Sequence, residues 1–134
     1  MREIEERLIK EMKKALKHDD VPVGALILRK GKILCSACNT RDSKNNILGH
    51  AEINVIKKAS KMLKTWNLSD CTLYVTLEPC DMCREIIKQS RIKKTYYFLG
   101  NNKKVNYKAD FELISSEIGQ ISLKNMQIFF ENKR

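Results

Sequence analysis

The sequence predicts a single three-layer α/β/α domain, over residues 1–134, around a central mixed sheet of about five strands. Three observations support this prediction. A chain of 134 residues has the length of one ordinary domain. Segments rich in β-forming residues alternate with segments of helical periodicity, which is typical of a sheet covered by helices on both faces. No repeat, linker or low-complexity block interrupts the chain.

The first half of the chain predicts one helix followed by a hairpin. An amphipathic helix is expected over about the first 17 residues, because apolar residues recur there at helical spacing. An apolar stretch at 21–28, a tight connection at 29–32 and a second strand at 33–40 then form the hairpin. His18 follows the helix, where a histidine usually lies near the last carbonyls, so it is given no ligand role.

The second half continues the alternation. A second helix is expected from Ala51, with His50 at its start, because apolar residues recur at helical spacing up to position 63. Residues 71–77 are rich in β-formers and predict a buried central strand, which Pro79 ends. A helix around residues 82–87, a strand at 95–99, short elements after Gly100 and a closing helix at 123–131 complete the chain.

Two short motifs carry the chemistry: His50-Ala51-Glu52 and Pro79-Cys80-Asp81-Met82-Cys83. One imidazole and two thiolates suit zinc, which keeps a fourth position for water in catalytic sites. Both motifs are expected at helix starts, where unpaired N–H groups stabilise thiolates. Glu52 could exchange protons with that water without binding the metal. Each motif alone has little meaning, but in this order they match an established signature of zinc nucleobase deaminases.

A second Cys-x-x-Cys pair, Cys35 and Cys38, raises an alternative of another class: a four-cysteine structural zinc module that binds nucleic acid. The 41 residues from 39 through 79 separate the two pairs, far more than the roughly 15–20 of zinc ribbons. Positions three apart in a strand also point to opposite faces. Cys35 and Cys38 are therefore predicted to be packing residues, and so is Cys71.

The charge balance favours an anionic partner. The net charge is +10, with an excess of +4 up to Cys83 and of +6 in the last 51 residues. Such an excess attracts nucleic-acid backbones, although A/T-rich codon usage would raise the lysine content equally well. The sequence has no apolar run of membrane-spanning length and no hydrophobic signal near the N-terminus. A cytoplasmic protein without a membrane partner is expected, and its five cysteines are expected to be free thiols or ligands.

The sequence resembles the bacterial tRNA-specific adenosine deaminases, within the cytidine-deaminase-like superfamily. The likeness covers about Val21 to Gly100, and the closing helix adds Phe129-Phe130 before a basic end. The matching blocks are Val21-Pro22-Val23-Gly24-Ala25, Asn39, His50-Ala51-Glu52, Thr72-Leu73-Tyr74-Val75-Thr76-Leu77-Glu78-Pro79-Cys80, Met82-Cys83 and Ser90-Arg91-Ile92.

The resemblance implies a hydrolase that converts adenosine to inosine at the wobble position of a tRNA anticodon, releasing ammonia. It implies one Zn²⁺ per chain, bound by His50, Cys80 and Cys83, with Glu52 transferring protons. It further implies that Asn39 and the backbone N–H of Ala51 contact the target base. The implied partners are the tRNA anticodon stem-loop and a second copy in a homodimer. The alternative enzyme is a deaminase of a free nucleoside or nucleobase, of the cytidine or guanine type.

Three segments depart from the pattern of the family. Asn46-Ile47-Leu48-Gly49 precedes His50 in place of Asp-Pro-Thr-Ala, Arg84-Glu85 follows the second cysteine in place of small residues, and no Lys-Thr-Gly-Ala-like segment lies within 101–110. Glu78 is expected to be structural, since it directly precedes Pro79. Lys103 and Lys104 are expected to hold RNA phosphates, because positive charge is densest in the last 51 residues.

Overall fold

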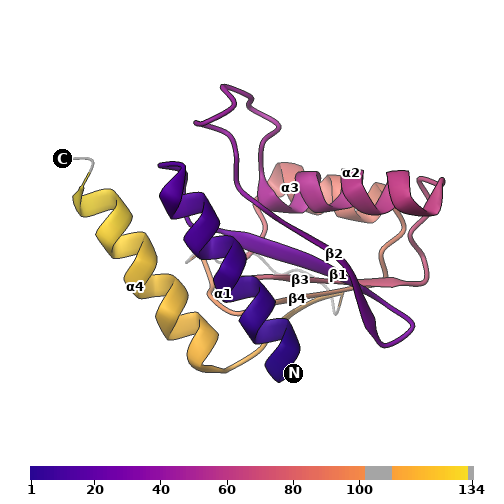
Figure 1. The fold of residues 1–134 in the computed structure, drawn as a ribbon. Coiled ribbons are helices and arrows are strands. Elements are labelled where there is room, and N and C mark those ends of the chain that lie inside the picture. Colours follow the sequence, from indigo (N-terminus) through magenta and orange to yellow (C-terminus); the bar gives the residue numbers. More distant parts are fainter. Residues whose placement is uncertain (102–109, 133–134) are drawn as a thin grey trace.

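The computed structural model describes residues 1–101 and 110–132, which form four helices and five strands (Figure 1). Lys103 and Lys104 lie outside the described residues, so their docking role stays a prediction. The elements follow the expected alternation: α1 (Arg2–Lys17), β1 (Gly24–Arg29), β2 (Lys32–Cys38), α2 (Ala51–Leu63), β3 (Cys71–Val75), α3 (Asp81–Gln89), β4 (Lys94–Tyr97), β5 (Phe111–Leu113) and α4 (Glu117–Glu131).

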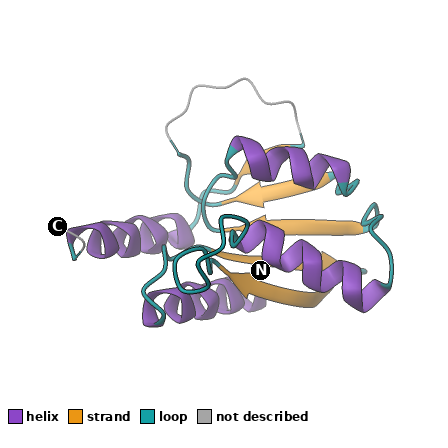
Figure 2. Cartoon of the chain, turned by 90° about the horizontal axis from the view of Figure 1, so that it is seen from above, coloured by secondary structure: helices purple, strands orange, loops and turns teal. Residues whose placement is uncertain are grey.

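The strands form one mixed sheet in the order β2-β1-β3-β4-β5. β1 pairs antiparallel with both β2 and β3, whereas β3, β4 and β5 run parallel. Helices α2 and α3 cover one face, and α1 and α4 cover the other (Figure 1). Seen from above, the strands lie side by side beneath α2 and α3 (Figure 2). The predicted three-layer α/β/α domain with five strands is thus confirmed.

The expected hairpin joins β1 to β2 through a two-residue turn. Lys30 and Gly31 both have positive φ, 52° and 76°, which is the geometry of a turn whose twist matches that of its strands. β2 is an edge strand of the sheet, whereas β3 lies between β1 and β4. Four of the five residues of β3 are buried, as predicted for a central strand covered on both faces.

Alternation along the strands sorts the apolar side chains into two cores. Ile27 and Leu73 pack in the larger cluster, together with Val55 of α2 and Ile87 of α3. Their neighbours on the strands, Leu26 and Tyr74, belong to a second cluster with Leu8 of α1 and Ile118 of α4. Each helical layer therefore has its own apolar seam against the sheet. No helix in the described part of the chain is long and apolar enough to cross a membrane.

The closing helix starts earlier than expected, at Glu117 where the sequence indicated Leu123. Ser116 caps it, and its side chain accepts a hydrogen bond from the Ile118 N–H at 3.1 Å. Gly119 lies in the first turn and obscured the helical pattern. A methyl group at Gly119 would lie only 2.5 Å from the carbonyl oxygen of Phe98. The glycine therefore permits close contact between α4 and the end of β4.

Replacing Gly119 by alanine tests this contact. Alanine normally stabilises a helix interior by about 1 kcal/mol relative to glycine. Here the added methyl would push against backbone, so we expect Gly119→Ala to lower the free energy of unfolding by about 1–3 kcal/mol. Thermal unfolding measures the change, with Gln127→Ala at an exposed position of the same helix as control. A Gly119→Ala protein at least as stable as wild type would contradict the packing argument.

Candidate metal centre

Two helix N-termini carry the predicted ligands. His50 is the N-cap residue of α2, and Cys80 is the N-cap residue of α3, both with extended backbone. Cys83 lies in the first turn of α3, where a residue three positions after Cys80 shares its face of the helix. Pro79 favours the extended conformation just before the helix. The predicted positions of all three residues at helix starts are confirmed.

The three side chains converge although they lie 30 and 33 residues apart. The Nδ1 atom of His50 lies 3.5 Å from the Cys83 Sγ and 3.8 Å from the Cys80 Sγ. The three ligand atoms all lie within 4.8 Å of one another. A tetrahedral zinc site with ordinary bond lengths separates nitrogen and sulfur by about 3.6 Å and two sulfurs by about 3.8 Å. The donor set and its spacing therefore fit zinc, and a fourth position is left for water.

Glu52 lies in the first turn of α2, next to the ligand Cys83, and only 5% of its surface is exposed. Burial raises the pKa of its carboxyl to about 7, opposed by hydrogen bonds from its backbone N–H and from Cys83. A carboxyl group with a pKa near neutrality can both accept and release a proton at physiological pH. Among the described residues, the cluster of potential metal ligands holds His50, Cys80 and Cys83 and does not include Glu52.

Two of the ligands, His50 and Cys83, have shifted pKa values in the metal-free protein. Burial, aided by the Arg41 charge, lowers the pKa of His50, so its imidazole is neutral and able to donate a lone pair. Burial and the neighbouring Glu52 and Cys80 raise the pKa of the Cys83 thiol. Since a metal binds the thiolate, binding must release the Cys83 proton.

A small cavity of about 160 Å³ opens over this cluster. This volume is well below the roughly 300–1,000 Å³ typical of sites for drug-sized ligands, so it suits a single ring system. Val21, Val23 and Leu77 form its apolar wall, whereas Asn39, Arg41, Glu52 and Glu78 provide polar groups. Asn39 and Ala51, the two residues predicted to contact a base, both line the cavity.

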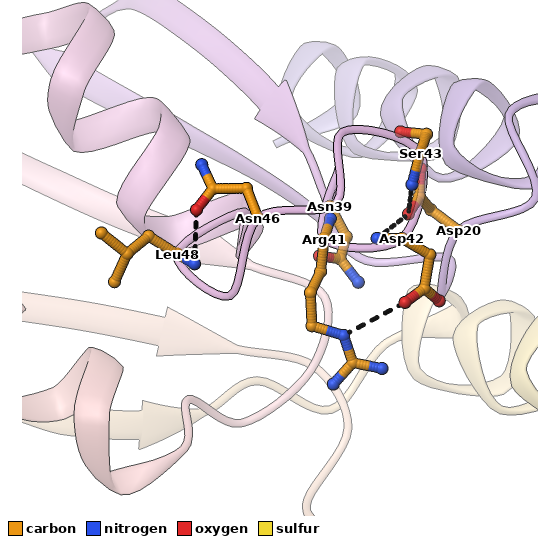
Figure 3. Close-up of polar contacts among 7 residues, drawn as sticks. All are labelled: Asp20, Asn39, Arg41, Asp42, Ser43, Asn46 and Leu48. Carbon is orange, nitrogen blue, oxygen red and sulfur yellow. Dashed lines mark hydrogen bonds and ion pairs between the residues drawn. The ribbon is translucent and has the colours of Figure 1, made fainter.

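Asn39 and Arg41, which line the cavity, belong to the loop at residues 39–49, and Figure 3 shows polar contacts of this loop. Asp20, which is fully buried, accepts hydrogen bonds from the backbone N–H groups of Asp42 and Ser43 at 2.8 and 3.0 Å. The Oδ1 atom of Asn39 accepts a hydrogen bond from the Arg41 N–H at 3.4 Å. The buried Asp20 carboxylate thus holds the backbone of the loop at Asp42 and Ser43.

The sequence did not predict a buried ion pair behind the cysteines. Glu78 and Arg84 bracket the Pro79–Cys83 segment, and the Arg84 guanidinium donates to the Glu78 carboxylate. Glu78 also accepts a hydrogen bond from the Asn101 N–H at 3.2 Å, and Arg84 lies over the Phe111 ring. These contacts support the structural role expected of Glu78. The only signal in the sequence is an acid and a base flanking the two cysteines.

The other cysteine pair remains apart from the metal ligands. The Cys35 thiol faces α2 and contacts the Val55 carbonyl at 3.7 Å. On the opposite side of β2, the hydroxyl of Ser36 donates to the carboxylate of Glu11 in α1. Within the described residues, the cluster of potential metal ligands holds His50, Cys80 and Cys83 and neither Cys35 nor Cys38. The geometry thus gives no support to a four-cysteine site.

Comparison with known proteins agrees with this geometry. Residues 2–134 match the family described as MafB19-like deaminase. The tRNA-specific adenosine deaminase of Bacillus subtilis (strain 168) is 45% identical over 89 residues, and that of Rickettsia felis is 36% identical over 115 residues. The alignments cover 66% and 84% of this chain. The chain spans 55% of the length of the Bacillus protein and 80% of that of the Rickettsia protein.

Solved structures share the fold. One comes from work on A-to-I editing by tRNA:A34 deaminases at the wobble position of transfer RNA. It is 29% identical, with a TM-score of 0.74, over 84% of this chain and 96% of that one. Guanine deaminase from Nitrosomonas europaea has a TM-score of 0.81 over 94% and 82% of the two chains at 14% identity, a likeness of fold alone. The chain therefore belongs to the MafB19-like deaminase family of the cytidine-deaminase-like superfamily, together with the tRNA-specific adenosine deaminases.

Proposed function

We propose that this chain is a zinc-dependent deaminase that converts adenosine to inosine in RNA, at the wobble position of a tRNA anticodon. The observation that carries the proposal is the convergence of His50, Cys80 and Cys83 beside a buried Glu52 in one cavity. The relatives named above, tRNA-specific adenosine deaminases, give the substrate class. We propose further that residues 1–134 act as one catalytic domain.

His50, Cys80 and Cys83 would hold one zinc ion. When bound, zinc supplies a Lewis acid and an activated water near neutral pH. The neutral imidazole of His50 can donate a lone pair at once, whereas Cys83 must first lose its proton. The Glu78–Arg84 ion pair would position both cysteines by fixing the segment between them.

Glu52 would carry every proton in the reaction. It would accept a proton from the attacking water and deliver it to a ring nitrogen, which makes C6 of adenine electrophilic. After the water oxygen has bonded to C6, Glu52 would take the second proton from the new hydroxyl and deliver it to the amino group. The C6–N bond then breaks, ammonia leaves and the C6 carbonyl of inosine remains. Its raised pKa of about 7 suits a group that must both accept and donate near neutrality.

The cavity would receive one flipped base. A base inside a stack cannot reach the ligands, so the target must be unpaired or extruded. Ala51 is the first residue of α2, and its backbone N–H has no partner within the helix, so it can donate to the substrate. The Asn39 amide would bind the ring from the opposite wall. We propose that the protein acts in the cytoplasm and as a homodimer, as the resemblance implies.

We expect the purified protein to contain one zinc ion per chain, and Cys80→Ser and Cys83→Ser to lose it. Loss of one thiolate leaves two protein ligands, too few for a tight site. Metal analysis measures the occupancy. The Cys35→Ser/Cys38→Ser double variant is the matched control and should retain its zinc. Full occupancy in both Cys80→Ser and Cys83→Ser would refute the assigned ligand set.

Glu52→Gln should keep its zinc and its fold but lose turnover. A general acid–base group typically contributes roughly 10²–10⁴-fold, and a sole proton carrier should lie at the upper end. Deamination of an RNA substrate by wild type and variant, at equal zinc content, measures the effect. Activity within threefold of wild type would remove Glu52 from the mechanism.

The same substitution has a separate effect on stability in the metal-free protein. The pKa of Glu52 is about 7 in the folded state and 4.5 ordinarily, so the folded state binds the extra proton. Stability due to this group is therefore complete below pH 4.5 and is lost as the pH rises to 7, by on the order of 3 kcal/mol. Glu52→Gln should remove this loss, so the variant should gain stability relative to wild type between pH 5 and 8. Parallel pH profiles of the unfolding free energy would contradict the burial argument.

The substrate itself is tested by offering anticodon stem-loops with adenosine at the wobble position, adenosine, cytidine and guanine. We expect ammonia release and inosine formation only with the stem-loop RNA. Asn39→Ala should reduce turnover of that RNA while leaving most of its affinity, because phosphate contacts dominate binding. Deamination of free cytidine or guanine without any reaction of RNA would establish the alternative function.

A further inference from the structure

A cavity larger than the metal cavity lies elsewhere among the described residues. It has a volume of about 680 Å³, against about 160 Å³ for the metal cavity. It lies where β2, the edge strand, ends, between the last turns of α1 and the outer face of α2. The loop that follows Asn39 closes its third side.

Positive side chains dominate this cavity. Its lining contains no aspartate or glutamate, but it includes one histidine and five lysines: His18, Lys14, Lys44, Lys57, Lys58 and Lys61. A second hollow along β2 shares Lys14 and Lys58 and adds Arg7 and Lys10. The acid nearby, Glu11, is buried and accepts a hydrogen bond from the Ser36 hydroxyl. It is a single negative charge beside the four basic side chains of that second hollow.

This arrangement is unfavourable for the isolated protein. Lys57 and Lys61 are one turn apart on α2, and Lys10 and Lys14 are one turn apart on α1. Like charges at this spacing destabilise a helix. An anionic ligand that enters the cavity would relieve the repulsion, and phosphate groups are bound readily by lysine ammonium groups.

The basic cavity and the metal cavity share a wall. Asn39 and Arg41 line the metal cavity, whereas Thr40, between them, lines the basic cavity together with Ser43. The wall is fixed, because the Asp20 carboxylate holds its backbone from one side (Figure 3). From the other side, the Asn54 amide donates to the Thr40 hydroxyl at 2.9 Å. A polynucleotide that crosses this wall would extend from one cavity into the other.

We propose that the basic cavity binds the phosphodiester backbone of the RNA substrate, next to the nucleotide that enters the metal centre. This inference rests on the proposed function. Lysine contacts with phosphates supply affinity and position without regard to base, and base choice is left to the metal cavity. The docking role expected of Lys103 and Lys104 concerns residues outside the described part of the chain and stays a prediction of its own.

Lysines beside an edge strand have a second possible role, since they discourage pairing with another chain. Lys58 acts in this way, because its Nζ donates to the Ser36 carbonyl of β2 at 2.8 Å. Lys57 and Lys61 are exposed on α2. Changing Lys57 and Lys61 while keeping Lys58 therefore tests RNA binding without exposing the edge strand β2 to pairing with another chain.

The experiment compares wild type, Lys57→Ala/Lys61→Ala and a control, Lys88→Ala/Lys93→Ala, which removes the same charge. The control pair lines a hollow that also contains Glu85 and Asp110. Binding of an anticodon stem-loop is measured from 50 to 300 mM salt, and its deamination is measured at saturation. We expect the test variant to bind about tenfold or more weakly at 0.1 M salt, with a salt slope smaller by about two. KM should rise, kcat should stay within twofold, and the control should match wild type.

Unchanged affinity and slope in the test variant would overturn the inference, and so would an equal loss in the control. A fall in kcat at saturating RNA without a change in affinity would also overturn it. Thermal unfolding checks the fold, and the single changes Lys57→Gln and Lys61→Gln give the same comparison if the double variant fails to fold. If wild type deaminates no RNA, the proposed function fails. If it deaminates RNA and the lysines have no effect, only the inference fails.

Discussion

The meeting of two helix N-termini at one end of the sheet is the constraint on which the rest of the structure depends. His50 and Cys80 each cap a helix, and their ligand atoms must come within a few ångströms of each other. Val55 of α2 and Ile87 of α3 pack in one apolar cluster against the sheet, which fixes the two helices side by side. A displacement of either helix by about 1 Å would spoil the ligand geometry, since metal–ligand distances tolerate only about 0.2 Å.

Local patterns were sufficient to predict the elements and the ligands. The helical spacing in α1 and α2, the β-rich segment around β3 and the motifs at His50 and Cys80 are all contained within short windows of sequence. The proton-transfer role of Glu52 was inferred from its place two residues after His50, whereas its burial was seen only in the structure. The beginning of α4 was missed because Gly119 is poor in helix propensity, and only its contact with Phe98 explains its presence.

Features formed by distant segments could not be predicted in this way. The Glu78–Arg84 pair needs the turn around Pro79 to bring its members together, and neither residue alone indicates it. The place of Arg41 at the cavity mouth depends on a loop fixed by Asp20, about twenty residues earlier. The split of positive charge along the chain pointed to the last 51 residues. In the folded chain, however, five lysines from α1, α2 and the loop after β2 line one cavity at the end of β2.

The order of strands in the sheet determines when the site can form as the chain folds. The β1–β2 hairpin needs only local contacts and can form early, but β3 must insert beside β1 across more than forty residues of chain. Such long-range pairing is slow, because the entropy cost of closing the loop comes before the stabilising contacts between the strands can form. Until β3 is in place, Cys80 and Cys83 have no imidazole beside them and no core to shelter them. A metal ion that needs all three ligands can therefore bind only after β3 has paired with β1.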